Sequence, residues 1–395
     1  RSVVAGPSQE EVRRQNLGAL LCHVHRQGPT TRAELTARLG LNRSTIGALT
    51  ADLVAAGLVT EEAPRETGRA GRPSLVVTPR SDMVYAYALT IEVDRLRAAR
   101  VGLGGVVLDQ REAPREPDRS VADVLPRLVA FVAEMGAKAP PAARCIGTGV
   151  AVCGRVRTAG GAADPTVGLG VGWLTEPVRA ALAPVLPAGC PVTLGAVADL
   201  AALAESARGV AVGCQNVIYL YGDLGIAAGI VAGGRRVSGY GGTAGEVGHM
   251  VVRPDGRRCG CGSRGCWETE VGERALLTAA GRAHADGRAA VREVVDAAVR
   301  GDATAQTAVR QVADWLGFGV GNLINIFNPE MVIFGDALRD IFLAAAAPLR
   351  SRLNAVGLTG NLAHVRLRTP ALGDDAVLIG AAELAFERLL ADPLG

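Results

Sequence analysis

Four side chains between positions 249 and 266 place the strictest constraint on how this 395-residue chain folds. The stretch HMVVRPDGRRCGCGSRGCWE contains His249, Cys259, Cys261 and Cys266, although the whole sequence has only five histidines and eight cysteines. One imidazole and three thiolates favour zinc, and four such ligands close a tetrahedron. Because a closed tetrahedron leaves no position for a reacting water, we predict a structural Zn²⁺ site. The alternative is a group of reactive or merely buried thiols.

The remaining cysteines are predicted to be reduced and buried. They lie in apolar segments of a large chain, and the first twenty residues carry charges throughout, without the apolar core of a secretory signal. No apolar run approaches the roughly 18 residues that cross a bilayer. We therefore expect a cytoplasmic protein with no membrane partner. The cysteines concerned are Cys22, Cys145, Cys153, Cys190 and Cys214.

Residues 1–80 are predicted to form a separate, mildly basic DNA-binding domain. They hold eleven arginines against seven acidic residues, whereas the rest of the chain is close to neutral. Three helical patterns follow one another here, and the second opens with a capping box made by Thr31 and Glu34. Only Gly40 and Leu41 separate the second pattern from Asn42, which is a good cap for the third. Two short helices joined by so tight a turn predict a helix-turn-helix.

The third helix is predicted to read DNA. Its leading end offers Asn42, Arg43, Ser44 and Thr45, and we expect Thr50 on its exposed side. Side chains at this end of a recognition helix reach base edges in the major groove, where arginine pairs with guanine. Double-stranded operator DNA is therefore the expected partner.

Two short apolar strands follow, on either side of the loop that contains GRAGRP, and together they predict a wing. Arg69 and Arg72 in this loop suit a narrow minor groove or its phosphates. The alternative for the whole domain is a helical bundle whose exposed face merely carries arginine. His23 and His25 are predicted to be surface or helix-packing residues.

From Met83 onward, strand patterns alternate with helix patterns, which predicts an α/β body large enough for two lobes. Within this body, AGEVGH at 244–249 and CGCGSRGCWE at 259–268 resemble the signature of the ROK family, named for repressors, open reading frames and kinases. NPEMVIFGDAL at 328–338 is similar to the late nucleotide-side motif of that family, and a winged helix with a GRAGRP wing is similar to its repressor branch.

The resemblance implies an α/β fold in which a winged helix-turn-helix at 1–80 precedes a two-lobed body of the actin-like ATPase and sugar-kinase type at 81–395. Lobe 1 is expected at about 81–195 plus a C-terminal helix at 375–391, and lobe 2 at about 196–374. The resemblance also implies that the His/Cys cluster binds zinc and that Glu246, His249 and Glu268 contact a sugar.

The positions that the family's kinases use for catalysis are altered. Asp94 matches the aspartate of the phosphate loop, but residues 95–97 read Arg-Leu-Arg where glycines should follow. Bulky side chains block the close backbone approach on which such a loop depends. Asp223 puts a negative charge in the second phosphate turn, and Ala196 and Val197 replace the family's asparagine and catalytic aspartate. Neither replacement can accept a proton, so we expect no phosphotransfer.

The sugar side is only half retained, since Ala196 and Val197 cannot bond a hydroxyl. Either the effector is not an ordinary hexose or the pocket has lost its ligand. Glu246 and Glu268 bind the effector or support the zinc loop, and Asp199 points toward the lobe interior or toward solvent. Trp173 and Trp267 are predicted to be packing residues.

These observations favour a ROK-type transcriptional regulator, most simply a repressor, with a catalytically inactive body. We expect a homodimer or homotetramer that binds a palindromic operator and responds to a sugar or sugar-derived effector. An active sugar kinase with an added DNA-binding domain is the main alternative. A regulator that no longer binds a small molecule is another.

Overall fold

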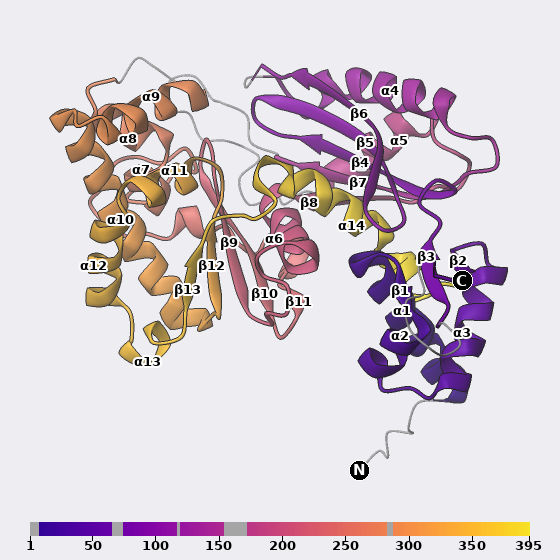
Figure 1. Cartoon of the computed structure of the whole chain (residues 1–395). Helices are drawn as coiled ribbons and strands as arrows, with labels where there is room; N and C mark the ends of the chain where they lie inside the picture. Colours follow the sequence, from indigo (N-terminus) through magenta and orange to yellow (C-terminus); the bar gives the residue numbers. More distant parts are fainter. Residues whose placement is uncertain (1–7, 65–73, 117–118, 154–171, 283–286) are drawn as a thin grey trace, which may run out of the picture.

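The computed structural model describes residues 8–64, 74–116, 119–153, 172–282 and 287–395. Each of its three parts is built on a sheet of its own (Figure 1). Within these residues, none of the helices combines the length and the apolar character that a bilayer crossing demands.

The N-terminal part is the predicted winged helix-turn-helix. Helices α1 (Gln9–Gln27), α2 (Arg32–Leu39) and α3 (Arg43–Ala55) pack beside a sheet of order β1-β3-β2, formed by Thr30–Thr31, Val76–Pro79 and Val59–Glu62. The capping box forms as predicted, and the Asn42 side chain accepts a hydrogen bond from the Thr45 amide at 2.8 Å. Strands β2 and β3 are antiparallel and form the base of the wing.

The first body sheet has the order β6-β5-β4-β7-β8. Its strands are β4 (Val84–Ile91), β5 (Arg95–Gly102), β6 (Val106–Pro114), β7 (Arg144–Val152) and β8 (Val192–Ala196). The chain turns at Gly104 and Gly105, which both have positive φ, and this turn separates β5 from β6. Helices α4 (Val121–Lys138) and α5 (Thr175–Leu182) pack in the core on one face of this sheet, and the last helix, α14 (Ala376–Ala391), packs on the other.

The second body sheet has the order β11-β10-β9-β12-β13. Its strands are β9 (Val217–Gly222), β10 (Ile226–Ala232), β11 (Arg235–Arg236), β12 (Met331–Phe334) and β13 (Arg366–Arg368). The backbone leaves helical geometry at Gly272 and at Ala345, and each of these residues separates two consecutive helices. The helices on its outer side are α7 (Trp267–Val271), α8 (Glu273–Ala279), α9 (Gly287–Val299), α10 (Ala303–Phe327), α11 (Asp336–Ala344), α12 (Ala346–Val356) and α13 (Thr359–Leu362).

Two helices join the parts. Helix α6 (Val197–Arg208) follows β8 directly and contacts both α14 and the second sheet, so it lies between the two body sheets (Figure 1). The backbones of α6 and α14 are in close contact, since a Cβ added at Gly380 would lie 1.9 Å from the Leu200 carbonyl oxygen. Helix α14 also touches α1, where a Cβ at Gly18 would lie 2.5 Å from the Leu390 carbonyl oxygen. The last helix of the chain therefore supports the first.

Candidate metal centre, ligand cleft and nucleic-acid interface

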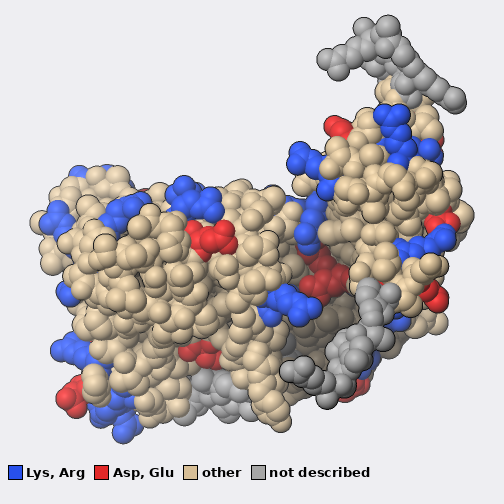
Figure 2. Space-filling view, turned by 90° about the horizontal axis from the view of Figure 1, so that it is seen from below, with Lys and Arg blue, Asp and Glu red and all other residues tan. Residues whose placement is uncertain are grey.

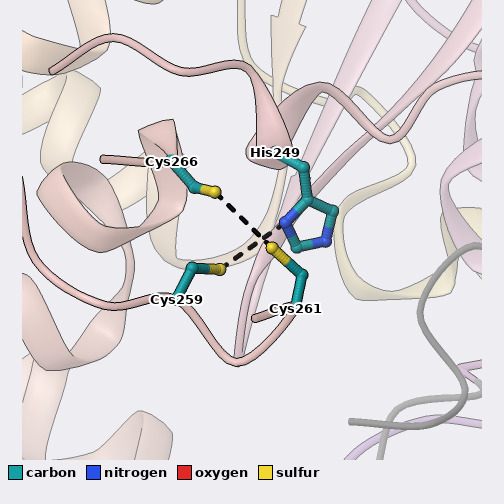
Figure 3. A group of neighbouring side chains, drawn as sticks. All are labelled: His249, Cys259, Cys261 and Cys266. Atoms are coloured by element: carbon teal, nitrogen blue, oxygen red, sulfur yellow. Dashed lines mark hydrogen bonds between the residues drawn. The ribbon is translucent and has the colours of Figure 1, made fainter. Parts of the chain in front are cut away.

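The four predicted metal ligands converge. His249 ends a short 3-10 turn (Val247–His249), Cys259 and Cys261 lie in the loop that follows, and Cys266 directly precedes α7 (Figure 3). Their ligand atoms all lie within 4.8 Å of one another. The Cys259 Sγ to His249 Nδ1 distance and the Cys261 Sγ to Cys266 Sγ distance are both 3.6 Å. A tetrahedron with zinc–sulfur bonds of about 2.3 Å has edges of about 3.8 Å, so this donor set fits Zn²⁺.

The loop that carries the cysteines depends on glycine. Gly262 and Gly265 have φ values of 93° and 72°, a region that side chains disfavour. A Cβ at Gly265 would lie 1.6 Å from the Arg253 carbonyl oxygen, so no other residue fits there without moving the chain. Below the loop, Trp267 is fully buried and its Nε1 donates to the Trp315 carbonyl at 2.8 Å, which confirms its packing role. Trp173, by contrast, is 47% exposed, so its predicted packing role is wrong.

Glu246 and Glu268 lie against the metal ligands. Glu246 Oε2 is 3.7 Å from His249 Nε2, and Cys259 Sγ lies 3.2 Å from Glu268 Oε1. The Glu268 side chain is 10% exposed, whereas that of Glu246 is 41% exposed. A carboxylate beside the second nitrogen of a metal-bound histidine orients the ring and raises its basicity. Both glutamates are thus placed to support the metal loop, and Glu246 in addition reaches solvent.

The start of α6 carries Asp199, whose carboxyl group interacts electrostatically with Glu246. Ala196 provides no side-chain cap for this helix, and Val197 is buried. Burial and the neighbouring Glu246 carboxylate raise the pKa of Asp199 to about 7, while the guanidinium of Arg236 acts in the opposite direction. Asp199 is half-buried in this position. Arg236 carried no motif that could have singled it out.

A second charged group lies where the sequence placed the altered phosphate turns. The Arg288 guanidinium is 3.1 Å from the Asp336 carboxylate and 3.6 Å from that of Asp223. Burial raises the pKa of Asp336 to about 8 and that of Asp223 to about 7. Asp94 adds a further negative charge that acts on both Asp223 and Arg288. The guanidinium of Arg288 is thus the cation that accompanies these carboxylates. Arg288 was not among the residues predicted from the sequence.

The leading end of α3 is open to solvent, as a DNA-reading surface requires. Asn42, Arg43 and Ser44 are exposed and Thr45 is half-buried. The prediction that Thr50 is exposed is wrong. Thr50 is fully buried and its Oγ1 donates to the Ile46 carbonyl at 2.7 Å. It therefore faces the domain core and cannot touch DNA. The other two predicted DNA contacts, Arg69 and Arg72, lie outside the described residues.

On the face shown in Figure 2, charge alone does not mark a DNA-binding area. Basic and acidic side chains are interspersed there instead of forming one broad basic area. Direct contacts by a few side chains at the end of α3 therefore carry the argument for base recognition better than a general basic field does.

A buried polar cluster joins the winged helix to the body. His25 of α1 is fully buried, and its ring lies 4.7 Å from that of Phe386 in α14. Its Nδ1 accepts a hydrogen bond from the Gly104 amide at 2.8 Å, so the proton of the neutral ring resides on Nε2, which lies 3.2 Å from Glu383 Oε1. Arg208, the last residue of α6, donates to the same carboxylate oxygen at 2.5 Å and to the His25 carbonyl at 2.9 Å. His25 is thus a packing residue, as expected, but its partners lie in the body.

A winged helix-turn-helix on a two-lobed, sugar-kinase-like body with a His/Cys₃ cluster defines the class: a DNA-binding transcriptional regulator. Comparison with known proteins agrees, since residues 86–388 match the ROK family and residues 19–70 match the MarR family. The chain belongs to the ROK family.

Relatives of the full length are repressors by name. The chain is 24% identical to the xylose repressor of Bacillus subtilis (strain 168) over 388 residues, which cover 97% of each protein. It is 27% identical to a putative xylose repressor of Caldicellulosiruptor sp. (strain Rt8B.4) over 92% of the chain and 93% of the relative. A glucokinase of Streptomyces coelicolor is 30% identical over 55% of the chain and 73% of its own length. The family thus contains both repressors and kinases.

Solved structures agree with the fold. The crystal structure of a ROK family transcriptional regulator, a homolog of the E. coli MLC protein, superimposes with a TM-score of 0.73 at 24% identity and covers 97% of this chain and 98% of that one. A ROK family glucokinase from Streptomyces griseus, in complex with glucose and AMPPNP, gives a TM-score of 0.60 at 27% identity and covers 76% and 98%.

Proposed function

We propose that this chain is a transcriptional repressor that binds operator DNA through its winged helix and uses a catalytically inactive ROK body to receive a small-molecule signal. The observation that carries the proposal is the joining of an intact DNA-reading helix to a body with Ala196 and Val197 at the catalytic positions. Such a chain retains the means to bind DNA and has lost the proton acceptor for sugar phosphorylation.

Arg43 is the residue best placed to read a base. It lies in the first turn of α3, is exposed, and among the described residues makes no hydrogen bond or ion pair. A free guanidinium at this end of a recognition helix can bond the O6 and N7 of one guanine at the same time. The side chain of Asn42 is already engaged within the protein, since its Oδ1 accepts hydrogen bonds from Ser44 Oγ at 2.7 Å and from the Thr45 amide. It therefore orders the end of the helix.

Three features oppose phosphotransfer. The first is Val197, which offers no group to take a proton from a sugar hydroxyl. The second is the altered phosphate loop, where Arg95 and Arg97 both donate to the Asp374 carbonyl, at 3.2 Å and 3.0 Å, and Arg97 pairs with Asp375. Both arginines lie at the start of β5, and their side chains tie this strand to the segment that precedes α14. A phosphate loop needs bare backbone amides at such a turn.

The third feature is Arg288, whose guanidinium lies between Asp223 and Asp336. In a kinase, this kind of site must hold the triphosphate and its metal ion. Here the Arg288 guanidinium already contacts both carboxylates, so a metal ion that bridged them to a triphosphate would have to displace this arginine. The group as it stands therefore opposes nucleotide binding in the orientation that transfer requires.

A zinc ion held by His249, Cys259, Cys261 and Cys266 would have a structural role. Such an ion would fix the loop that positions Glu246 and Glu268. The four protein ligands leave no position for substrate, so its contribution would be to folding energy.

The effector is proposed to be a sugar or a sugar derivative that binds beside this loop, near Glu246, His249, Glu268 and the start of α6. The xylose repressors among the relatives are consistent with a sugar effector. The apolar Ala196 and Val197 argue against an ordinary hexose, because each lost hydroxyl partner costs about 1–3 kcal/mol. A regulator without an effector remains the alternative. The oligomer is proposed to be a homodimer or homotetramer, as a palindromic operator requires.

Helix α6 connects the two functions. It begins at residues 196–199, beside the proposed effector site, and ends at Arg208, which bonds Glu383 and the His25 carbonyl at the winged helix. A helix transmits a shift of one end to the other because its backbone is rigid. A ligand that moves the start of α6 would therefore move Arg208 against α1. This movement would change how the DNA-binding domain is positioned on the body.

Two measurements on the purified, zinc-loaded protein test this function. Fluorescence anisotropy with the DNA upstream of its own coding region, against random DNA at two salt concentrations, should give specific binding at least about a thousandfold tighter. Incubation with ATP, Mg²⁺ and a hexose panel should give no sugar phosphate above background. Equal affinity for both DNAs, with and without sugars, would reject the repressor, and turnover of any one sugar would restore the kinase alternative.

A further inference from the structure

Two cysteines outside the metal centre lie in contact. Cys145 is the second residue of β7, and Cys190 lies two residues before the neighbouring parallel strand β8. Their Sγ atoms are 3.6 Å apart. Both were expected to be buried, as was Cys22, but all three are partly exposed, whereas Cys153 and Cys214 are buried as predicted. Both residues of the Cys145–Cys190 pair therefore retain some exposed surface.

We propose that Cys145 and Cys190 form an oxidisable dithiol that hydroperoxides convert to a disulfide. The pair stands on its geometry: two thiols in contact, partly exposed, at the same end of two paired strands. A disulfide requires the sulfur atoms to approach from 3.6 Å to about 2.05 Å, a movement that side-chain rotation and a small shift of the loop before β8 can supply. Neither residue belongs to the metal site, the ligand cleft or the DNA-reading surface.

The two thiols have different surroundings, which assigns their roles. The sulfur of Cys190 lies within hydrogen-bonding distance of the Cys145 thiol, and Thr148 Oγ1 lies 3.6 Å from the Cys190 sulfur. These hydrogen bonds lower the pKa of Cys190 to about 7, whereas the bond to Cys190 and burial raise the pKa of Cys145. The thiolate is the nucleophile in thiol oxidation, so Cys190 reacts first and Cys145 resolves.

The steps balance with a hydroperoxide as the oxidant. The Cys190 thiolate attacks one peroxide oxygen, an S–O bond forms, the O–O bond breaks, and the departing oxygen takes a proton to leave as water or an alcohol. Cys190 is then a sulfenic acid. Cys145 gives up its proton, its sulfur attacks that of Cys190, the S–S bond forms, and the hydroxyl leaves as water. The two thiols lose two electrons in total, and the peroxide gains them.

The Cys145–Cys190 disulfide would form in the sheet on which α14, the helix that supports the winged helix, packs. A Cβ at Gly147, two residues after Cys145, would lie 3.2 Å from the Ala385 carbonyl oxygen of α14 and 3.7 Å from that of Pro191, next to Cys190. Glu383 and Phe386 of the same helix hold His25. Oxidation would therefore fasten β7 to the loop before β8 beneath α14, and would close a covalent loop from Cys145 to Cys190.

Peptide mapping of the full-length, zinc-loaded protein after treatment with hydrogen peroxide tests the proposal. We expect a crosslinked peptide that contains Cys145 and Cys190, two mass units lighter than the sum of the reduced peptides and lost on reduction with dithiothreitol. Before oxidation, Cys190 should react with iodoacetamide at pH 7 at least about ten times faster than Cys22, whose thiol pKa is raised by burial.

Variants separate this dithiol from two inert thiols. In Cys145→Ser, peroxide should leave a sulfenic acid on Cys190 that dimedone traps, whereas Cys190→Ser should give neither the crosslink nor a trapped sulfenic acid on Cys145. Cys22→Ser is the matched control and should crosslink like the wild type. Equal alkylation rates for Cys190 and Cys22, or peroxide-treated wild type in which 145 and 190 stay reduced or are oxidised singly, would overturn the proposal. Because mapping reports each cysteine separately, oxidation of the metal ligands does not interfere.

Discussion

His25 Nε2 lies 3.2 Å from Glu383 Oε1, although 358 positions separate these residues in the chain. Both side chains are buried, with exposed fractions of 0% and 3%. Arg208 completes the group by donating to the Glu383 carboxylate and to the His25 carbonyl, so the DNA-binding domain is held by polar contacts that have definite geometry. Such contacts favour one arrangement of the two parts more strongly than an apolar contact of the same area would, because each buried donor and acceptor must find its partner.

His25→Ala should lower the free energy of unfolding by about 1–3 kcal/mol, because it leaves the Gly104 amide and the Glu383 carboxylate short of a partner in a buried site. His23→Ala is the matched control on the same helix; His23 is only half-buried, and the change should cost less than about 0.5 kcal/mol. Urea unfolding measured by circular dichroism compares the two. Equal and small losses would contradict a stabilising role for the cluster.

The stability should fall with pH below about 6.5, and His25 should account for part of that fall. Burial lowers the pKa of His25 in the folded protein, against the opposing effect of Glu383. Between the two pKa values, His25 is therefore protonated in the unfolded chain and neutral in the folded chain. The contribution of His25 to the free energy of unfolding is present above the unfolded pKa and is lost as pH drops. Unfolding at pH 7.5 and 5.5 should show a smaller difference for His25→Gln than for the wild type, and an unchanged difference would refute this origin.

Glu383 makes a second contribution to the loss of stability as pH falls, and this contribution acts at lower pH than that of His25. Burial alone would raise the pKa of Glu383, but the hydrogen bond with His25 and the charge of Arg208 hold it at about 2. The stabilisation is present above the usual glutamate value of about 4.3 and is lost as pH falls from there toward 2. In Glu383→Gln, unfolding between pH 5 and pH 3 should depend on pH less steeply than in the wild type. A curve parallel to that of the wild type would contradict the shift.

Arg208→Ala should uncouple DNA binding from the effector. The wild type should change its operator affinity by roughly 5–150-fold when a sugar that raises its melting temperature is added. In the variant, the same sugar should still raise the melting temperature, but the change in operator affinity should shrink to less than about threefold. Arg310→Ala, at an exposed position on α10, serves as the control. A variant with the full response would rule out α6 as the connection.

Cys261→Ser should lower both the zinc content and the stability, because a lost ligand forfeits part of the metal-coupled folding energy. We expect about one zinc per chain in the wild type by metal analysis, and a clearly lower melting temperature in the variant. Cys214→Ser changes a buried cysteine outside the cluster and should keep its zinc. A zinc-free preparation of undiminished stability would contradict the structural role.

Arg43→Ala should cost roughly 1–3 kcal/mol on the operator and much less on random DNA, because it removes a base contact and leaves the phosphate contacts unchanged. Thr50→Val provides a demanding control on the same helix. Its hydroxyl bonds the Ile46 carbonyl inside the domain, so the variant should discriminate between DNA sequences like the wild type. Gel-shift titrations measure both, and reversed behaviour of the two variants would exclude this orientation of α3.

The helix-turn-helix and the His/Cys₃ cluster could be predicted because their signals are local: caps, a two-residue turn, and ligands within eighteen positions. Thr50 was misassigned because its polarity was taken as a sign of exposure. In the structure its hydroxyl is satisfied by the carbonyl four residues earlier, which allows threonine to face a core. Trp173 was misjudged for the opposite reason, as large aromatic residues are usually buried.

The long-range contacts could not be predicted from one sequence. Arg288 and Asp336 are 48 positions apart, and His25 and Glu383 are 358 apart, so only the topology brings them together. No motif distinguishes Arg288 among the many arginines of the chain. What the sequence did indicate was that the surrounding positions are altered, because other residues stand where the family's kinases have a phosphate loop and a catalytic aspartate.

The packing of α14 against α1 has a consequence for how the protein is made. Translation proceeds from the N-terminus, so the winged helix leaves the ribosome first and can form its own small core early. The residues of α14 that hold it, however, include Glu383, Phe386 and Leu390, which are synthesised long after the winged helix. A nascent chain still short of α14, or a chain truncated before it, would thus carry a DNA-reading domain without this support, and control over that domain would begin only once α14 has been made.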